Sequence, residues 1–271
     1  MPFRQSPTWK HVLLWASSVL LLACAGSPRT ARKDLRLDTE SAARLRHASS
    51  LGQGARALAS TSHAASAVLA GSVPGLVTLL ERDNAVADLE DRLWECARRA
   101  EQQVNAAFFG GRAPTRQECG QEVEVDGCGV VVTRAMRLGQ RKHMLALQCA
   151  REVLEHLWPA PFSIEQRYRF YPHARLLETV SREEEARLVA QGCTRELWRT
   201  IKPDIVLHGD SNLLTSVLTL DFKFPCPDTN VPRWTSYGEK SAYAGSSQGR
   251  VYNEALQGEA FMVSPRLGFI P

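Results

Sequence analysis

The stretch "TLDFKFPCPDT", residues 219–229, alternates apolar and polar side chains and then runs into a proline-rich turn. Successive side chains of a β-strand point to opposite faces, so this stretch predicts a strand with one apolar face. The apolar face consists of Leu218, Leu220, Phe222 and Phe224. The other face presents Asp221 and Lys223 together, with Cα atoms about 6 to 7 Å apart. Such a pair indicates either a salt bridge on a surface strand or a catalytic site.

A second β-rich run, "DIVLHG" at residues 204–209, precedes this strand and is separated from it by a polar turn. The two runs predict an antiparallel hairpin, in which Asp204 at the start of one strand lies near Asp221 at the end of the other. Two carboxylates at one sheet edge repel each other unless a cation lies between them, and oxygen ligands suit Mg²⁺ or Mn²⁺. Lys223 beside them can activate a water molecule or stabilise charge on a phosphate. We therefore expect Asp204, Asp221 and Lys223 to be catalytic, with both aspartates binding the metal.

The succession Pro203-Asp204, hairpin, Asp221-Phe222-Lys223 resembles the signature of the PD-(D/E)XK nucleases. This resemblance implies an α/β, restriction-endonuclease-like fold, in which a mixed central sheet is flanked by helices. "LGQRKHMLAL" and "QGRVY" resemble two further motifs of the RecB-like branch of that family. They imply that His143 is a metal ligand and that Gln248 and Tyr252, one helical turn apart, support the site.

Other acids compete with His143 for the position of the helix ligand, because other branches of the fold use a glutamate there. Glu152 and Glu155 lie on the same expected helix, and Glu165 lies on the following strand. Each is also interpretable as a solvated charge, and His143 as a surface or core histidine. The cysteine spacing of an iron–sulfur cluster, which the RecB-like branch often carries, is missing here.

The rest of the chain from residue 81 predicts alternating helices and strands. Helices are expected at 81–107, at 134–158 up to Pro159, after the N-cap Ser181 up to Gly192, and at 248–257. "FSIEQRYRFY", residues 162–171, alternates like one strand, and "AFMVSPRLGFI", residues 260–270, closes the chain as another. The segment "GRAPTRQECG", residues 111–120, is expected to be a loop.

The amino-terminal part predicts export. Arg4 and Lys10 precede an apolar run that is too short to span a bilayer and ends in "LLAC". This ending resembles a bacterial lipobox, which implies cleavage of a signal peptide, residues 1–23, and attachment of acyl chains (palmitate) to Cys24. A plain cleaved signal peptide with an incidental cysteine is the alternative. Residues 24–75 are rich in Ala and Ser and predict a tether or a loosely helical stalk, with a helix that packs on a partner as the alternative. A helical and loop lead-in at 76–133 and the nuclease core at 134–271 follow.

Charge and cysteine content limit the possible classes of protein. The formal charge of the 271 residues is +4, and cleavage after Ala23 would lower it to +2, so charge alone does not point to nucleic acid. Six cysteines follow Cys24, an even number in a chain with an export signal, so disulfides are expected, with 15 possible pairings. No C-x-x-C pair occurs, which argues against a zinc site.

The chain from about residue 90 also resembles the toxin domain of a myxobacterial paralogous lipoprotein family. The resemblance is carried by "PTRQEC", "KPDIVLH", "DFKFPCP", "QGRVYNEAL" and "PRLGFIP", in this order. It implies an outer-membrane lipid anchor, delivery to kin cells, cleavage of DNA or RNA in the recipient cytoplasm, and a cognate immunity protein. A non-catalytic lipoprotein with a degenerate nuclease fold and an exported scavenging nuclease are the alternatives.

Overall fold

The computed structural model describes residues 68–271, apart from residues 70, 81–82 and 240. The predicted signal peptide, Cys24 and most of the predicted tether lie outside the described residues. Leu69 and Val73 are buried in the core, so the folded unit includes the last part of the segment expected as tether. Among the described helices, none has both the length and the hydropathy needed to cross a membrane.

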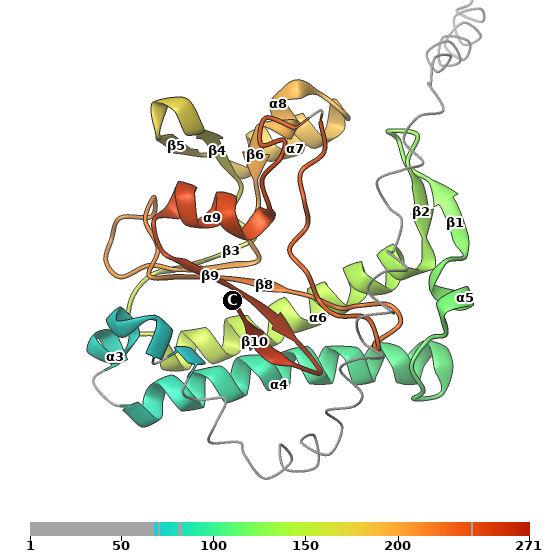
Figure 1. Ribbon diagram of the computed structural model, residues 1–271, viewed down its shortest axis with the longest axis horizontal. Coiled ribbons are helices and arrows are strands. Elements are labelled where there is room, and N and C mark those ends of the chain that lie inside the picture. Colours follow the sequence, from blue (N-terminus) through green and yellow to red (C-terminus); the bar gives the residue numbers. More distant parts are fainter. Residues whose placement is uncertain (1–67, 70, 81–82, 240) are drawn as a thin grey trace, which may run out of the picture. The chain divides into compact units, whose positions relative to one another are not determined.

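A five-stranded mixed sheet forms the centre of this mixed α/β fold (Figure 1). Its strand order is β10-β9-β8-β7-β3, and only β8 and β9 are parallel. A parallel neighbour needs a crossover connection, which here contains the helix α9, Gln248–Leu256. The strands are β3 (Phe162–Ile164), β7 (Ile205–Leu207), β8 (Leu218–Phe222), β9 (Glu259–Ser264) and β10 (Gly268–Ile270).

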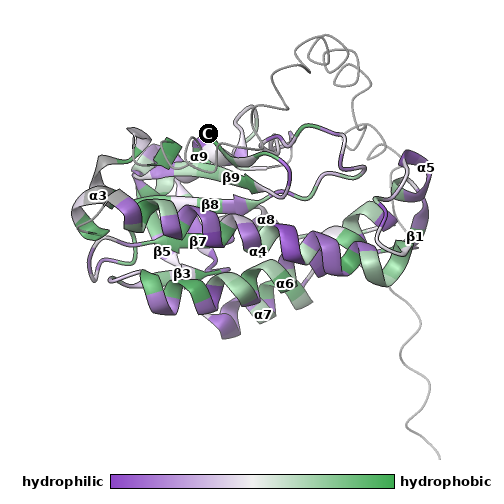
Figure 2. Cartoon of the chain, turned by 90° about the horizontal axis from the view of Figure 1, so that it is seen from below, coloured by the Kyte–Doolittle hydropathy of each residue, from purple (hydrophilic) through white to green (hydrophobic). Residues whose placement is uncertain are grey.

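Two long helices cover one face of this sheet. α4, Asp83–Phe109, and α6, Arg134–Leu157, lie side by side, and both carry hydrophobic and hydrophilic residues in alternation (Figure 2). Their apolar sides, with the short helix α3 (Pro74–Leu80), enclose the larger core together with Leu218, Leu220 and Phe222. The predicted placement of Leu218, Leu220 and Phe222 on one apolar face of β8 is therefore confirmed.

The other face of the sheet packs against α9 and a smaller three-stranded sheet of order β5-β4-β6. Tyr168, Val206 and Tyr252 lie in this second core. The remaining elements here are β4 (Tyr168–Tyr171), a 3₁₀ turn (Pro172–Ala174), β5 (Leu176–Thr179), α7 (Arg182–Ala190), α8 (Arg195–Trp198) and β6 (Thr200–Ile201).

Three disulfides connect distant parts of the chain, as the even cysteine count predicts. Cys96–Cys149 joins α4 to α6. Cys119–Cys226 joins the end of α5, Arg116–Cys119, to the segment after β8. Cys128–Cys193 joins the turn of a hairpin, β1 (Glu122–Val125) and β2 (Val131–Thr133), to the link between α7 and α8.

Several predicted elements differ from the observed ones. Residues 162–171 form two strands in different sheets, because Glu165 adopts a left-handed backbone conformation (φ 48°) and breaks the run. Residues 260–270 belong to a hairpin, β9–β10, that turns just before Gly268 (φ 70°). The expected loop at 111–120 contains α5, which Thr115 and Glu118 open with a reciprocal capping box.

Candidate active site

Asp204 and Asp221 lie opposite each other on the β7–β8 hairpin. Ile205 pairs with Leu220, and the next position outward on each strand is an aspartate. Asp204 Oδ2 accepts a hydrogen bond from the backbone N–H of Phe222 at 2.7 Å. Asp204 and Asp221 are 9% and 3% exposed, so the hairpin holds two carboxylates in a nearly dry environment.

Asp221 is held by side chains of α9. Gln248 Nε2 donates to Asp221 Oδ1 at 3.0 Å, and the hydroxyl of Tyr252 lies 3.3 Å from the same oxygen. Gln248 also donates to the Tyr252 hydroxyl at 2.7 Å. The one-turn spacing of the two residues therefore places both against one carboxylate.

Lys223 follows β8 directly and turns back toward Asp221. Its Nζ lies 2.5 Å from Asp221 Oδ2 and donates to Gln248 Oε1 at 2.7 Å. The ring of Trp234 lies beside this ammonium, with its centroid 5.5 Å from Nζ. The lysine is thus fixed between a carboxylate, an amide and an aromatic ring, in a position where it can act on a substrate bound at Asp221.

His143 reaches the same site from α6. Its Nδ1 lies 3.0 Å from Asp204 Oδ2, and its ring packs edge-on against Phe224 at 5.2 Å between centroids. Burial lowers the pKa of His143, but the hydrogen bond to Asp204 and the charges of Asp204 and Asp221 outweigh it, so the net shift is upward. In this arrangement His143 orients Asp204, whereas its role as a metal ligand stays a prediction.

Burial raises the pKa of Asp221 to about 6, and the negative charge of Asp204 adds to this shift. The nearby cations Lys223 and His143 oppose the shift. Two adjacent carboxylates that resist joint ionisation create a site where a bound divalent cation would be stabilised.

The donor set at this site suits Mg²⁺. Within the part of the chain that the structure describes, no three His, Cys, Asp or Glu side chains gather into a ready-made metal cage. Mg²⁺ does not need such a cage, because it is usually bound by one or two carboxylates together with water and substrate phosphates. Asp204 and Asp221 provide these two carboxylates.

The side chains of the glutamates that competed with His143 for the position of the helix ligand make no hydrogen bond or ion pair with the two aspartates of the site. Glu152 and Glu155 are exposed on α6. The carboxylate of Glu165 pairs with Lys202 at 3.1 Å and not with an aspartate of the site.

Sequence reasoning missed Trp234, which borders Lys223 and packs edge-on against Tyr252 at 6.1 Å. Its ring covers Gly249, where an added Cβ would lie only 2.5 Å from the indole. The glycine directly after Gln248 was a possible signal, because a glycine inside a helix often marks a close approach of another group.

Comparisons of the chain with models of protein families, with curated proteins and with solved structures found no match. What the protein does must therefore be inferred from the geometry of the site and from the residues that form it.

Proposed function

We propose that the protein is a metal-dependent nuclease that hydrolyses phosphodiester bonds in DNA or RNA. The observation that carries this proposal is the convergence of Asp204, Asp221 and Lys223 at one end of the β7–β8 hairpin. Opposed carboxylates can bind a metal ion that polarises a phosphate, and an adjacent lysine can stabilise the charge that develops there during hydrolysis.

The topology supports the finer assignment to the PD-(D/E)XK nucleases. In chain order, the elements around the site are α6, β3, β7, β8, α9 and β9, and the three motif-bearing segments are α6, the β7–β8 hairpin and α9. His143 of α6 contacts Asp204, while Gln248 of α9 bonds to both Asp221 and Lys223, so the three segments meet at the two aspartates of the hairpin. This is the order in which the resemblance places them.

Each residue has a distinct task in the proposed reaction. Asp204 and Asp221 would hold Mg²⁺ or Mn²⁺, which supplies positive charge for the scissile phosphate. Lys223 orients the attacking water and stabilises the charge that develops on the phosphate. The water oxygen gives up a proton and forms the new bond to phosphorus, the bond to the leaving ester oxygen breaks, and this oxygen takes up a proton from the solvent. Gln248 and Tyr252 keep Asp221 in place, and His143 keeps Asp204 in place.

The activity test uses the chain without residues 1–23, incubated with plasmid DNA, total RNA and tRNA. We expect cleavage with Mg²⁺ and none with EDTA. Lys223→Ala and Asp221→Ala should each lower the rate by about 100-fold or more, since loss of one group that stabilises charge costs about that much. The control Glu155→Gln removes an exposed carboxylate from α6 and should leave the rate unchanged. Undiminished cleavage by both site variants would refute the assignment.

The cellular role that we propose is that of an exported, lipid-anchored interbacterial toxin of the outer membrane, attached through Cys24. Three disulfides support export, because disulfides persist in oxidising compartments. A toxin that degrades nucleic acid in kin cells requires an immunity protein, whereas a scavenging nuclease does not. Expression without the signal peptide should be lethal, and co-expression of a companion gene that encodes the immunity protein should restore growth. Failure of every gene adjacent to the nuclease gene to restore growth would favour the scavenging nuclease.

A further inference from the structure

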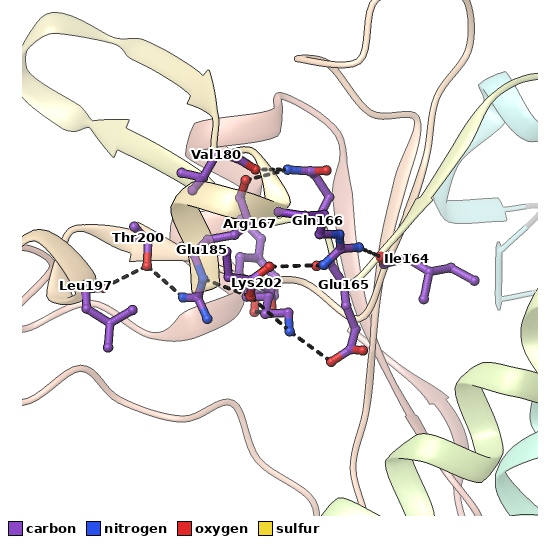
Figure 3. Close-up of polar contacts among 11 residues, drawn as sticks. Ile164, Glu165, Gln166, Arg167, Val180, Glu185, Leu197, Thr200 and Lys202 are labelled. Atoms are coloured by element: carbon purple, nitrogen blue, oxygen red, sulfur yellow. Dashed lines mark hydrogen bonds and ion pairs between the residues drawn. The ribbon is translucent and has the colours of Figure 1, made fainter. Parts of the chain in front are cut away.

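A cluster of charged side chains connects Arg167 just before β4, Glu185 of α7 and Lys202 in the segment that leads into β7 (Figure 3). Its centre is Glu185, whose side chain is only 12% exposed. The Glu185 carboxylate lies 3.2 Å from Arg167, 3.0 Å from Arg182 and 3.2 Å from Lys202. Burial raises the pKa of Glu185, but the bonds and charges of Lys202 and Arg167 outweigh it and leave a net downward shift. Glu185 is therefore an anion with three cationic partners.

Lys202 is the member of this cluster that leads to the site. Its Nζ lies between Glu185 and Glu165, at 3.2 and 3.1 Å. Its backbone carbonyl lies 3.2 Å from the hydroxyl of Tyr252. Only Pro203, whose ring fixes φ, separates it from Asp204. Lys202 thus holds the chain just before one metal-binding carboxylate and contacts the residue that supports the other.

Glu165 fixes the same segment from the other side. Its backbone N–H donates to the carbonyl of Asp204 at 2.9 Å, while its own carbonyl accepts from Arg182 at 3.0 Å. Glu165 has φ 48°, a left-handed conformation that is strained for a residue with a side chain and persists only when surrounding contacts hold it. The ion pair between the Glu165 carboxylate and Lys202 is one of these contacts. The strained backbone of Glu165 is therefore hydrogen-bonded directly to the backbone of Asp204.

We propose that Lys202 is a positioning residue of the active site: held by Glu165 and Glu185, it fixes the backbone from which Asp204 is presented to the metal. This inference rests on the proposed nuclease function. Lys202 acts through Asp204 and Tyr252 and does not touch the reacting atoms. Groups that orient metal ligands typically change metal affinity or activity by about 10- to 100-fold when they are removed.

The decisive variant is Lys202→Met, which keeps the length of the side chain and removes its charge. Glu185 then retains Arg167 and Arg182, so no buried charge is left alone and the fold is expected to survive. On the full chain, we expect the dissociation constant for Mn²⁺, measured by electron paramagnetic resonance, to rise by about 10- to 100-fold. Cleavage at low Mn²⁺ should fall by the same factor, and Lys202→Arg should restore most of both.

The controls separate positioning from general stability. Arg187→Gln removes an exposed charge from α7 that contacts Glu184, and Mn²⁺ affinity should not change. If Lys202→Met does not fold, Glu165→Gln decides the question: its side chain is 48% exposed, and its loss should weaken Mn²⁺ binding by a few-fold.

The outcomes for Lys202 and for the nuclease assignment can be told apart. An active wild type, together with a folded Lys202→Met variant of unchanged Mn²⁺ affinity and rate, would overturn the positioning role alone. If Lys202→Met does not fold, unchanged Mn²⁺ affinity in Glu165→Gln would likewise overturn the positioning role alone. A wild type that neither binds Mn²⁺ nor cleaves nucleic acid would overturn the proposed function and, with it, the role of Lys202.

Discussion

Glu90 lies inside α4 with 2% of its surface exposed, and neither carboxylate oxygen has a hydrogen-bond partner among the residues that the structure describes. Burial raises the pKa of Glu90 from 4.5 to about 8, and the charge of Asp91 adds to this shift. The folded protein therefore binds this proton more tightly than the unfolded chain does. Raising the pH from 4.5 to about 8 must then weaken the fold.

We predict that Glu90→Gln stabilises the protein at high pH. The gain should be about 1 to 3 kcal/mol at pH 8.5, part of what the rise in the pKa of Glu90 from 4.5 to about 8 implies, because glutamine carries no charge for burial to penalise. It should shrink toward pH 5, where the folded-state carboxyl is already neutral. Thermal unfolding at several pH values measures it. Glu155→Gln, at an exposed position of α6, is the control and should not change the pH dependence. An equal gain at pH 5 and pH 8.5 would contradict the role of ionisation.

Gly249→Ala should destabilise the protein by about 1 to 3 kcal/mol, the usual cost of overpacking, because the new methyl group meets the ring of Trp234. Tryptophan fluorescence should report the displaced ring. Gly139→Ala on α6 is the matched control, since nothing lies within 4 Å of its added Cβ. There we expect the opposite sign, a gain of about 0.5 to 1 kcal/mol from the higher helix propensity of alanine. A loss of the same size at both glycines would mean that Trp234 is not the cause.

At this scale, sequence reasoning brought together most of the candidate site. Period-two alternation placed Asp221 and Lys223 on one face, and hairpin pairing placed Asp204 opposite Asp221. Trp234 could not be found in this way, because its position depends on a long segment after β8 that returns to α9. The same holds for Lys202, whose partners Glu165 and Glu185 are close only after β4 and α7 have packed together.

Among the elements, α9 carries both Gln248 and Tyr252 and ends at Gln257, which has a left-handed conformation (φ 63°). Glycine adopts this conformation without steric cost and is the usual residue at such a helix end. We predict that Gln257→Gly stabilises the protein by about 0.5 to 1 kcal/mol, measured by urea unfolding. Gln257→Ala is the comparison and should give no gain, because alanine has the same Cβ penalty. Equal effects of both substitutions would show that the backbone conformation is not the source.

Elements with strong local signals were predicted correctly, and those that depend on distant contacts were not. The periodic helix around His143 and the hairpin between residues 204 and 224 were expected and are present. The break at Glu165 was missed because glutamate is not a usual turn residue, and contacts with Asp204, Arg182 and Lys202, distant in the sequence, hold the chain there. The hairpin β9–β10 had a visible signal, Pro265 and Gly268, inside what was interpreted as one apolar segment.

For the whole molecule, the sequence predicted disulfides but could not choose among 15 pairings, because pairing depends on which cysteines meet in the folded chain. The bonds also differ in accessibility. Cys128 is exposed, whereas Cys119 and Cys226 are 1% and 7% exposed.

We predict that mild reduction opens Cys128–Cys193 before Cys119–Cys226, because a thiolate must reach a sulfur atom to attack it. Alkylation at short times, followed by peptide mass spectrometry, measures the order. Nuclease activity should survive the first step, since the Cys128–Cys193 bond lies outside the network of Asp204, Asp221 and Lys223. Labelling of Cys119 and Cys226 first would contradict the prediction.

The large sequence separation of the paired cysteines also affects disulfide formation during synthesis of the chain. Synthesis proceeds from the amino end, so Cys96, Cys119 and Cys128 are all present before Cys149, the first native partner. Cys226, the native partner of Cys119, lies 107 residues further along the chain and is synthesised correspondingly later. Any bond formed among the three early cysteines is wrong and has to be exchanged later. Because the native partners are synthesised after the three early cysteines, we expect an enzyme that rearranges disulfides to speed the formation of the native bonds.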